Sequence, residues 1–198
     1  MDTHGTAQRI VAILLVAASA AAAFGSSVRI YGGSFNLPIP DKGRMADATI
    51  NVPDHHIISD IDVGISVVHT NVFDLQLFLQ SPAGTRICLN MYNAFDNFFK
   101  GANYTETIFD DEAEVPIEQA APPFTGRFKP LADFKLSAFD GKDAYGPWRL
   151  QIYDAFYYDT GTLNSFEIMV ENPEPETILL FTLGAGLIRL RKRPKQDL

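Results

Sequence analysis

The sequence predicts an all-β domain, either a sandwich or a barrel, between a hydrophobic leader and a hydrophobic tail. Apolar and polar residues alternate in several short segments, which is the period-two pattern of half-buried strands. No stretch of residues 24–172, which we call the body, keeps a helical period. Loops rich in Gly, Pro, Asp and Asn separate the alternating segments, as is typical of sandwiches and barrels.

The N-terminus has the composition of a secretory signal peptide. Arg9 precedes a continuous apolar stretch, Ile10–Ala23, which is rich in Ala, Leu and Val. The small residues Ala21–Ala23 suit signal peptidase, so we expect residues 1–23 to be removed by cleavage after Ala23. The alternative is a buried N-terminal helix, but this stretch has no polar face for solvent.

Four alternating segments predict strands in the body. Apolar residues alternate with polar ones from Ile61 to Val67 and again from Leu75 to Leu79. A Ser-Pro-Ala-Gly turn then leads into Thr85–Leu89, which is a hairpin signal. A third set is Trp148, Leu150 and Ile152. The last set is Leu163, Phe166, Ile168 and Val170, whose phase slips at Asn164-Ser165 and so predicts a β-bulge.

Length, cysteine content and charge describe the body as one acidic domain. It is long enough to bury a core without cross-links. The chain has 1 cysteine, Cys88, which excludes an intramolecular disulfide and which we expect to be a packed apolar residue. Residues 24–172 hold 10 Lys and Arg against 20 Asp and Glu, a net charge of −10. Such a surface repels phosphates, so we expect no nucleic-acid partner.

The sequence carries no recognisable catalytic motif, and we predict that the protein is not an enzyme. The body contains His55, His56 and His69, but no Gly-x-Ser-x-Gly and no His-Glu-x-x-His. A Ser-His-Asp site also needs a nucleophile held at a strained turn beside an oxyanion hole. We expect a structural hydrogen-bonding role for His69 and a solvated turn at His55-His56.

Acidic residues in loops are candidate calcium ligands. Asp110, Asp111 and Glu112 follow one expected strand, and Asp74 opens another. Calcium takes about six to eight oxygen ligands, which loops supply readily, and adjacent acids without a counter-ion repel one another. The alternative is a solvated acidic edge that resists aggregation. Further oxygen-bearing loop residues are Asp96, Asn97, Asp154 and Asp159.

Aromatic residues provide the second binding prediction. Phe156, Tyr157 and Tyr158 occupy the loop before Asp159. Exposed rings stack on sugars or fill a partner's pocket, because they offer a large contact area at a small entropy cost. The alternative is that they cover the open end of the domain. A second aromatic group consists of Tyr92, Phe95, Phe98, Phe99 and Tyr104.

A series of short motifs runs in a fixed order through the body. They are Ile39–Asp41, Ile61–Ile65, His69-Thr70, Asp74-Leu75, Leu79–Thr85, Thr107–Ala113, Phe128–Pro130, Leu136–Gly141, Gly146–Leu150 and Asp159–Phe166. In this order and spacing they resemble the P domain of proprotein convertases, the P/Homo B family. The match covers Ile39 to Glu171, with Phe166 where the family usually has Trp and Pro147 where it usually has a small polar residue.

The resemblance implies a jelly-roll-like β-sandwich related to galactose-binding folds. Domains of this family normally follow and stabilise a subtilisin-type catalytic domain, and some of them bind calcium. Only residues 24–37 separate the expected signal peptide from the first motif. We therefore do not transfer protease activity to this chain.

The C-terminus combines a Pro-Glu-Pro break, an apolar run and a basic end. Pro173, Glu174 and Pro175 precede the apolar segment 178–190, and Arg191, Lys192 and Arg193 follow it. A helix over 178–190 is about 20 Å long, short of the roughly 30 Å hydrocarbon core, which suits a sorting segment. The basic end is expected on the cytoplasmic side. The alternative is an amphipathic or core helix.

In this order the three features resemble the PEP-CTERM sorting tail of bacterial exported proteins. The resemblance implies that an exosortase-like enzyme reads residues 173–198 and that segment 178–190 holds the chain in the membrane before processing. We therefore predict a protein exported to the cell envelope, the outer surface or the extracellular matrix.

The function predicted from all of these features is that of a non-catalytic, P-domain-like structural or adhesive module in a polysaccharide-rich layer. One alternative is an accessory module that docks in trans on a secreted subtilisin-like protease. Another is a calcium-dependent carbohydrate-binding protein.

Overall fold

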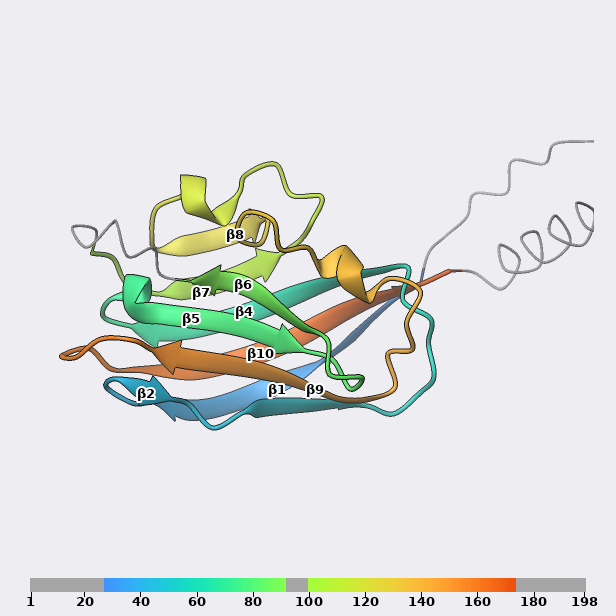
Figure 1. The fold of residues 1–198 in the computed structure, drawn as a ribbon, viewed down its shortest axis with the longest axis horizontal. Coiled ribbons are helices and arrows are strands. Elements are labelled where there is room, and N and C mark those ends of the chain that lie inside the picture. Colours follow the sequence, from blue (N-terminus) through green and yellow to red (C-terminus); the bar gives the residue numbers. More distant parts are fainter. Residues whose placement is uncertain (1–26, 92–99, 174–198) are drawn as a thin grey trace, which may run out of the picture.

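Two β-sheets packed face to face make up the part of the chain that the computed structural model describes, residues 27–91 and 100–173 (Figure 1). This part contains strands and three short 3-10 helices but no α-helix, which confirms the all-β prediction. The strands are β1 (Ser27–Ile39), β2 (Gly43–Arg44), β3 (Ala48–Val52), β4 (Asp60–His69), β5 (Leu75–Gln80), β6 (Arg86–Met91), β7 (Tyr104–Phe109), β8 (Phe124–Phe128), β9 (Gly146–Asp154) and β10 (Gly161–Asn172), and the 3-10 helices are η1 (Val72–Asp74), η2 (Ile117–Gln119) and η3 (Leu136–Phe139).

The two sheets have different strand orders. The first sheet runs β1-β10-β4-β7-β8, and the second runs β2-β9-β5-β6, with β3 also pairing with β9. Most neighbouring strands are antiparallel, but β7 and β8 are parallel. In Figure 1 the second sheet lies in front of β1, β10 and β4.

Apolar residues at alternate strand positions fill the space between the sheets, as the sequence pattern predicts. From β4, Ile61, Val63, Ile65 and Val67 point inward, and from β5 and β9, Leu75–Leu79 and Trp148–Ile152 supply the facing layer. The indole of Trp148 is fully buried, packs edge-on to Phe139 and donates a hydrogen bond to the Ala144 carbonyl over 2.8 Å. Removing this apolar surface from water is the main stabilising contribution.

Three local predictions are confirmed. The β10 ladder with β4 shifts register between Leu163 and Ser165, which is the expected bulge. The Ser81 amide bonds the Thr85 carbonyl over 2.9 Å and closes the hairpin turn between β5 and β6. Cys88 is buried in β6, and burial raises the pKa of its thiol to about 11, so it packs as an apolar residue.

The long strand β1 is missing from the strands that the sequence predicts. Most of its residues are exposed, and it includes the pair Gly32-Gly33, so it lacks the alternation of a half-buried strand. The strand is held in place by its pairing with β10. Glycine is required at position 32 of this strand, because an added Cβ would lie only 2.5 Å from the Cβ of Glu167.

The two ends of the described chain lie together, at one end of the sandwich. Ser27 pairs with Asn172, whereas the other end of β10 begins at Gly161, which pairs with Ile39 and His69. In Figure 1 the start of β1 and the end of β10 lie on the right, and the β9–β10 connection lies on the left. The predicted signal peptide lies outside the described residues.

Within residues 27–91 and 100–173, no helix has the length and apolar character needed to cross a membrane. The predicted segment 178–190 lies outside this part of the chain.

We expect Trp148→Ala to destabilise the domain by about 3–5 kcal/mol, because a large buried indole is lost and a cavity remains. The measurement is the free energy of unfolding in urea. Val68→Ala is the matched control, since Val68 is 54 % exposed on the same sandwich, and it should change stability by less than about 0.5 kcal/mol. Equal losses for the two variants would contradict the assignment of Trp148 to the core.

Candidate functional site

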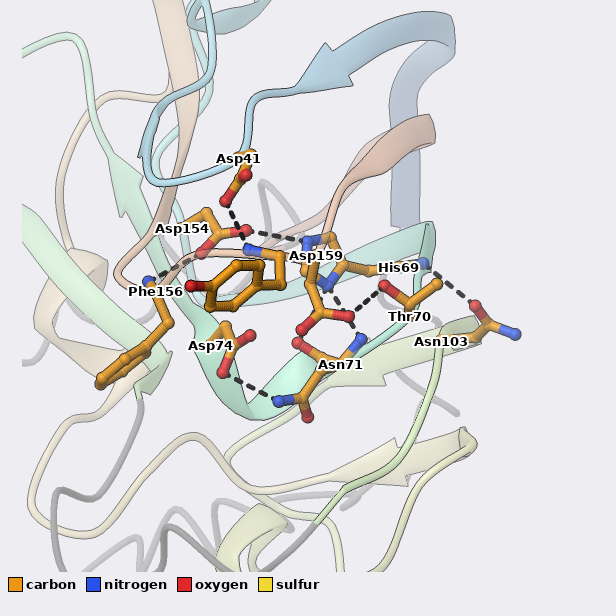
Figure 2. A network of polar contacts seen from close by, with 10 residues as sticks. Asp41, His69, Thr70, Asn71, Asp74, Asn103, Asp154, Phe156 and Asp159 are labelled. Carbon is orange, nitrogen blue, oxygen red and sulfur yellow. Dashed lines mark hydrogen bonds and ion pairs between the residues drawn. The ribbon is translucent and has the colours of Figure 1, made fainter.

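Polar and aromatic residues from both sheets lie together at one end of the sandwich (Figure 2). His69 ends β4 in the first sheet, and Asp154 ends β9 in the second. Asp74 ends η1, and its neighbour Leu75 pairs with Asp154. The loop 155–160 leaves from the same point, so strand pairing alone brings these segments together.

A buried histidine–carboxylate pair forms the centre of this end. The side chains of His69 and Asp154 are both 0 % exposed, and His69 Nε2 lies 3.1 Å from Asp154 Oδ2. The other ring nitrogen lies 2.9 Å from the Asn71 carbonyl oxygen, and the Phe156 amide donates to Asp154 Oδ1 over 2.9 Å. Burial raises the pKa of Asp154, and these partners compensate its desolvation. His69 thus makes the hydrogen bonds that we expected of it, on both ring nitrogens.

Asp74 is a second buried carboxyl at this end, with 6 % of its surface exposed. Its Oδ1 accepts a hydrogen bond of 2.9 Å from the Asn71 side-chain amide. Burial, followed by the charges of Asp154 and Asp159, raises the pKa of Asp74 to about 6. Figure 2 shows the three carboxyl groups around a common centre, so this end carries a concentration of negative charge.

The aromatic loop is held at several points by these carboxyl groups and by backbone contacts. The Ala155 amide donates to the Asp74 carbonyl over 2.8 Å, and the Tyr158 amide donates to Asp41 Oδ1 over 2.9 Å. At its far end, Thr70 donates to Asp159 over 2.5 Å. Tyr158 has a φ of 86°, a conformation that a non-glycine residue adopts only when its surroundings impose it.

The rings of this loop point into solvent although the backbone beneath them is fixed. Phe156 is 38 % exposed, Tyr157 is 58 % exposed and Tyr158 is 95 % exposed. The Nζ atom of Lys42 lies 4.0 Å from the centre of the Tyr157 ring, which is a cation–π contact. Exposed rings on a supported backbone make a binding surface with a small entropy cost of ordering.

The structure unites predictions that the sequence left separate. Asp74 and the loop residues Phe156, Tyr157 and Tyr158 belong to one site, together with Asp154 and Asp159. Sequence reasoning missed Asp41, which holds Tyr158, although it lies in the Ile39–Asp41 motif.

The other predicted calcium ligands lie at the opposite end of β4. Phe109, the last residue of β7, pairs with Val63 near the start of β4, so Asp110 and the two acids after it are far from His69 and Asp74. The four predicted ligands therefore do not form one site.

Each of these distant acids has a local role that the sequence did not reveal. Arg127 donates to both Asp110 and Asp62; burial alone would raise the pKa of Asp110, but the hydrogen bond from Arg127 holds it below its usual value. Asp111 accepts hydrogen bonds of 2.9 Å from the amides of Leu136 and Ser137, at the start of η3. Glu112 is exposed, and its amide donates to Asp110 over 2.6 Å.

Within residues 27–91 and 100–173, no group of three or more His, Cys, Asp or Glu side chains is arranged to hold a metal ion. We therefore assign no metal site to this part of the chain, and calcium binding stays a prediction.

Of the predicted sorting residues, only Pro173 belongs to the described part of the chain, where it follows β10. Glu174, Pro175, Arg191, Lys192 and Arg193 lie outside the described residues, as do Tyr92 to Phe99 of the second aromatic group. Tyr104 of that group is buried, and its ring stacks on Phe124 at a centroid distance of 5.0 Å.

Comparisons with known proteins leave the family open. No protein-family model and no curated protein matches the chain. Two solved structures that match are the serine protease of Aeromonas sobria in complex with its chaperone ORF2, with a TM-score of 0.47, and the same protease alone, with a TM-score of 0.45. Both are 20 % identical and cover 75 % and 74 % of this chain, which spans 27 % of their length. We base no functional argument on a likeness of this degree.

We expect the Asp74→Asn variant to be more stable than the parent protein at about pH 7, by up to about 3 kcal/mol, and equally stable below about pH 4. The Asp74 pKa rises from 3.8 to about 6 on folding, so the stability that its neutral form contributes is lost as the pH rises through that value. The amide keeps an acceptor for Asn71 but stays neutral throughout.

Urea unfolding of the two proteins between about pH 4 and pH 7.5 measures this difference. Asp133→Asn, at an exposed acid, is the control and should show no such trend. A difference between Asp74→Asn and the parent that does not change with pH would contradict the raised pKa.

Proposed function

We propose that this protein is an exported, non-catalytic module with an adhesive role at the envelope or in the extracellular matrix, and that it binds through the aromatic loop 156–158. The observation that carries the proposal is the display of Tyr157 and Tyr158 on a backbone fixed by hydrogen bonds from the Phe156 and Tyr158 amides. Aromatic faces beside carboxyl and amide groups suit sugar rings and their hydroxyls.

The position of the loop supports this role. Strand β10 is 12 residues long and spans about 40 Å at about 3.3 Å per residue, with the loop at its start and the described chain end at its finish. If the C-terminal tail holds the protein at the membrane, the loop points away from that membrane. A binding surface in this place reaches material outside the cell.

The buried centre of the site favours binding over catalysis. His69 and Asp154 have the residue types of a proton-transfer pair, but their side chains are 0 % exposed and therefore touch no substrate. Their hydrogen bonds hold the loop instead. The pair thus supports a rigid surface rather than a reaction.

Within this proposal we place the chain with the P/Homo B domains and their jelly-roll, galactose-binding-like relatives. The order of the motifs between Ile39 and Glu171 supports this placement. Residues of the His69-Thr70, Asp74-Leu75 and Asp159–Phe166 motifs contact one another around the site, although they are distant in the sequence.

The same motif order favours one second candidate, an accessory module that docks in trans on a secreted subtilisin-like protease. Co-purification separates the two functions. Recovery of the full chain with a subtilisin-like protease from the producing cell, and retention of that partner by a Tyr157→Ala/Tyr158→Ala variant, would favour the accessory module.

Thermal unfolding with calcium and with chelator tests the remaining candidate, a calcium-dependent carbohydrate-binding protein. A ligand that binds only the folded state adds about 2.7 kcal/mol at a hundredfold excess over its Kd. A midpoint that rises in calcium, but not in Asp74→Asn, would place the ion at this end. An unchanged midpoint would remove calcium from the proposal.

Export and sorting are tested on the producing cell. We expect the mature chain to begin at Phe24 and to stay with the envelope or matrix, and a chain that lacks residues 173–198 to appear in the medium. An intact N-terminus on a cytoplasmic product would overturn the proposed location.

We expect the Tyr157→Ala/Tyr158→Ala variant to bind extracellular material of the producing cell, or the best glycan of an array, at least about 30-fold more weakly, as central aromatic contacts commonly contribute about 2 kcal/mol or more. Both rings are exposed, so the thermal midpoint should not change. Tyr145→Ala is the control, because Tyr145 is 50 % exposed and precedes β9 at the opposite end. Equal losses for the two variants would contradict the assignment of binding to this loop.

A further inference from the structure

A second surface, separate from the aromatic loop, covers the outer face of the sheet β2-β9-β5-β6. The strand ladders place side chains of alternate residues on this face in rows. Gln80 pairs with Arg86 on one side and with Arg149 on the other, and Phe78 pairs with Gln151. Further along β9, Tyr153 pairs with Gln76 of β5 on one side and with Arg44 of β2 on the other. We call these residues the arginine face.

The charge of the arginine face is opposite to that of the body. The body carries a net charge of −10, from 10 Lys and Arg against 20 Asp and Glu. The arginine face has Arg44, Arg86 and Arg149, while Asp47 is the acid that contacts it, through an ion pair of 2.5 Å with Arg44. Among the described residues, the guanidinium of Arg149 makes no hydrogen bond or ion pair, so its donors are available to a ligand.

Contacts within the arginine face hold its rings and the Arg86 guanidinium in place. Arg86 lies 3.5 Å above the centre of the Phe78 ring and donates its Nε–H to Gln151 Oε1 over 2.8 Å. Gln151 is 6 % exposed and donates in turn to Gln80 Oε1 over 3.1 Å. The Tyr153 ring packs edge-on to Phe78, at a centroid distance of 6.1 Å. Little conformational entropy is therefore left to lose when a ligand binds.

Because Arg86 and Arg149 flank the same residue of β5, their strands lie about 10 Å apart, twice the strand spacing of about 4.8 Å. The terminal nitrogens of Arg86 stay available, since its printed hydrogen bond uses Nε. Two such guanidinium groups suit a ligand whose carboxylates repeat along its length, because a guanidinium binds a carboxylate through two parallel hydrogen bonds.

We propose that the arginine face binds an anionic polysaccharide, with carboxylates at Arg86 and Arg149 and a sugar ring against Tyr153, since the Arg86 guanidinium already covers the Phe78 ring. Side-chain amides such as those of Gln76 and Gln80 suit sugar hydroxyls. Strands β5 and β9 are paired on both sides and offer an extended peptide no backbone edge, whereas β6 is the edge strand of the sheet, so an acidic peptide is the alternative that the test must separate. This inference does not depend on the aromatic loop.

The test measures binding of the full chain, solubilised in a non-ionic detergent, to polygalacturonate, with dextran as the neutral probe and poly-glutamate as the acidic peptide probe. We expect binding to polygalacturonate that weakens as salt rises, and little or none to dextran or poly-glutamate. Arg149→Gln and Arg86→Gln should each weaken it by about tenfold. Arg149→Lys should lose most of the affinity as well, because lysine keeps the charge but not the fork.

The controls make each outcome decisive. Arg29→Gln removes an exposed arginine from β1 of the other sheet and should leave binding unchanged. Tyr157→Ala/Tyr158→Ala should also leave it unchanged, which separates this site from the aromatic loop. Arg149→Gln breaks no described side-chain bond, so its thermal midpoint should equal that of the parent.

Several results would overturn the proposal. They are no binding to polygalacturonate, equal binding to dextran, equal or tighter binding to poly-glutamate, an equal loss in Arg29→Gln, or a loss in the tyrosine variant without one in the arginine variants.

Discussion

The buried hydrogen bond between His69 and Asp154 joins the two sheets at the end of the sandwich where the site lies. His69 ends a strand of the first sheet and Asp154 ends a strand of the second, at a distance of 3.1 Å between their side chains. A carboxyl with no solvent contact is tolerated only when both of its oxygens have partners, and here a ring nitrogen and the Phe156 amide supply them. The need of this buried carboxyl for partners therefore fixes the start of the aromatic loop.

The residues that support the aromatic loop differ from the residues that it exposes. Asp154 and Asp41 accept hydrogen bonds from loop amides, and Thr70 donates to Asp159 at the end of the loop, so these residues hold the loop. The tyrosine rings do the opposite, since their backbone is fixed and their side chains are 58 % and 95 % exposed. Exposed rings on a fixed backbone offer a partner a surface of defined shape at a small entropy cost.

Charge is distributed unevenly over the sandwich, so its surfaces differ in the ligands that they suit. Acids concentrate at both ends of β4, where Arg127 neutralises one group and burial raises pKa values to about 6 in Asp62 and Asp74. The outer face of the second sheet instead carries arginines ordered by aromatic rings and amides. One small domain thus presents an aromatic end and a cationic face that do not compete for the same ligand.

The sequence by itself determined where the central strands lie and which of their faces is buried. Alternation predicted the cores of β4, β5 and β9, the turn at Ser81–Gly84 predicted β6, and the phase slip at Asn164-Ser165 predicted the bulge in β10, because a period of two and a tight turn are local features of the chain. Strand β1 could not be predicted in this way, because most of its residues are exposed and the adjacent glycines Gly32-Gly33 interrupt any alternation. The prediction of Phe156–Tyr158 and Asp74 as binding candidates was likewise local, and it did not show that they share one site.

Only the tertiary structure decided which segments became neighbours. Asp74 and Asp110 look alike in the sequence, but β4 separates them by its whole length, and Asp111 is used to hold η3. Arg44, Arg86 and Arg149 are scattered along the chain and meet through the register of β9 with β2 and of β5 with β6 and β9. The physical reason is that an alternating strand can pair with any other such strand, so the order of strands in a sheet is set by the packing of the whole domain and not by any local pattern.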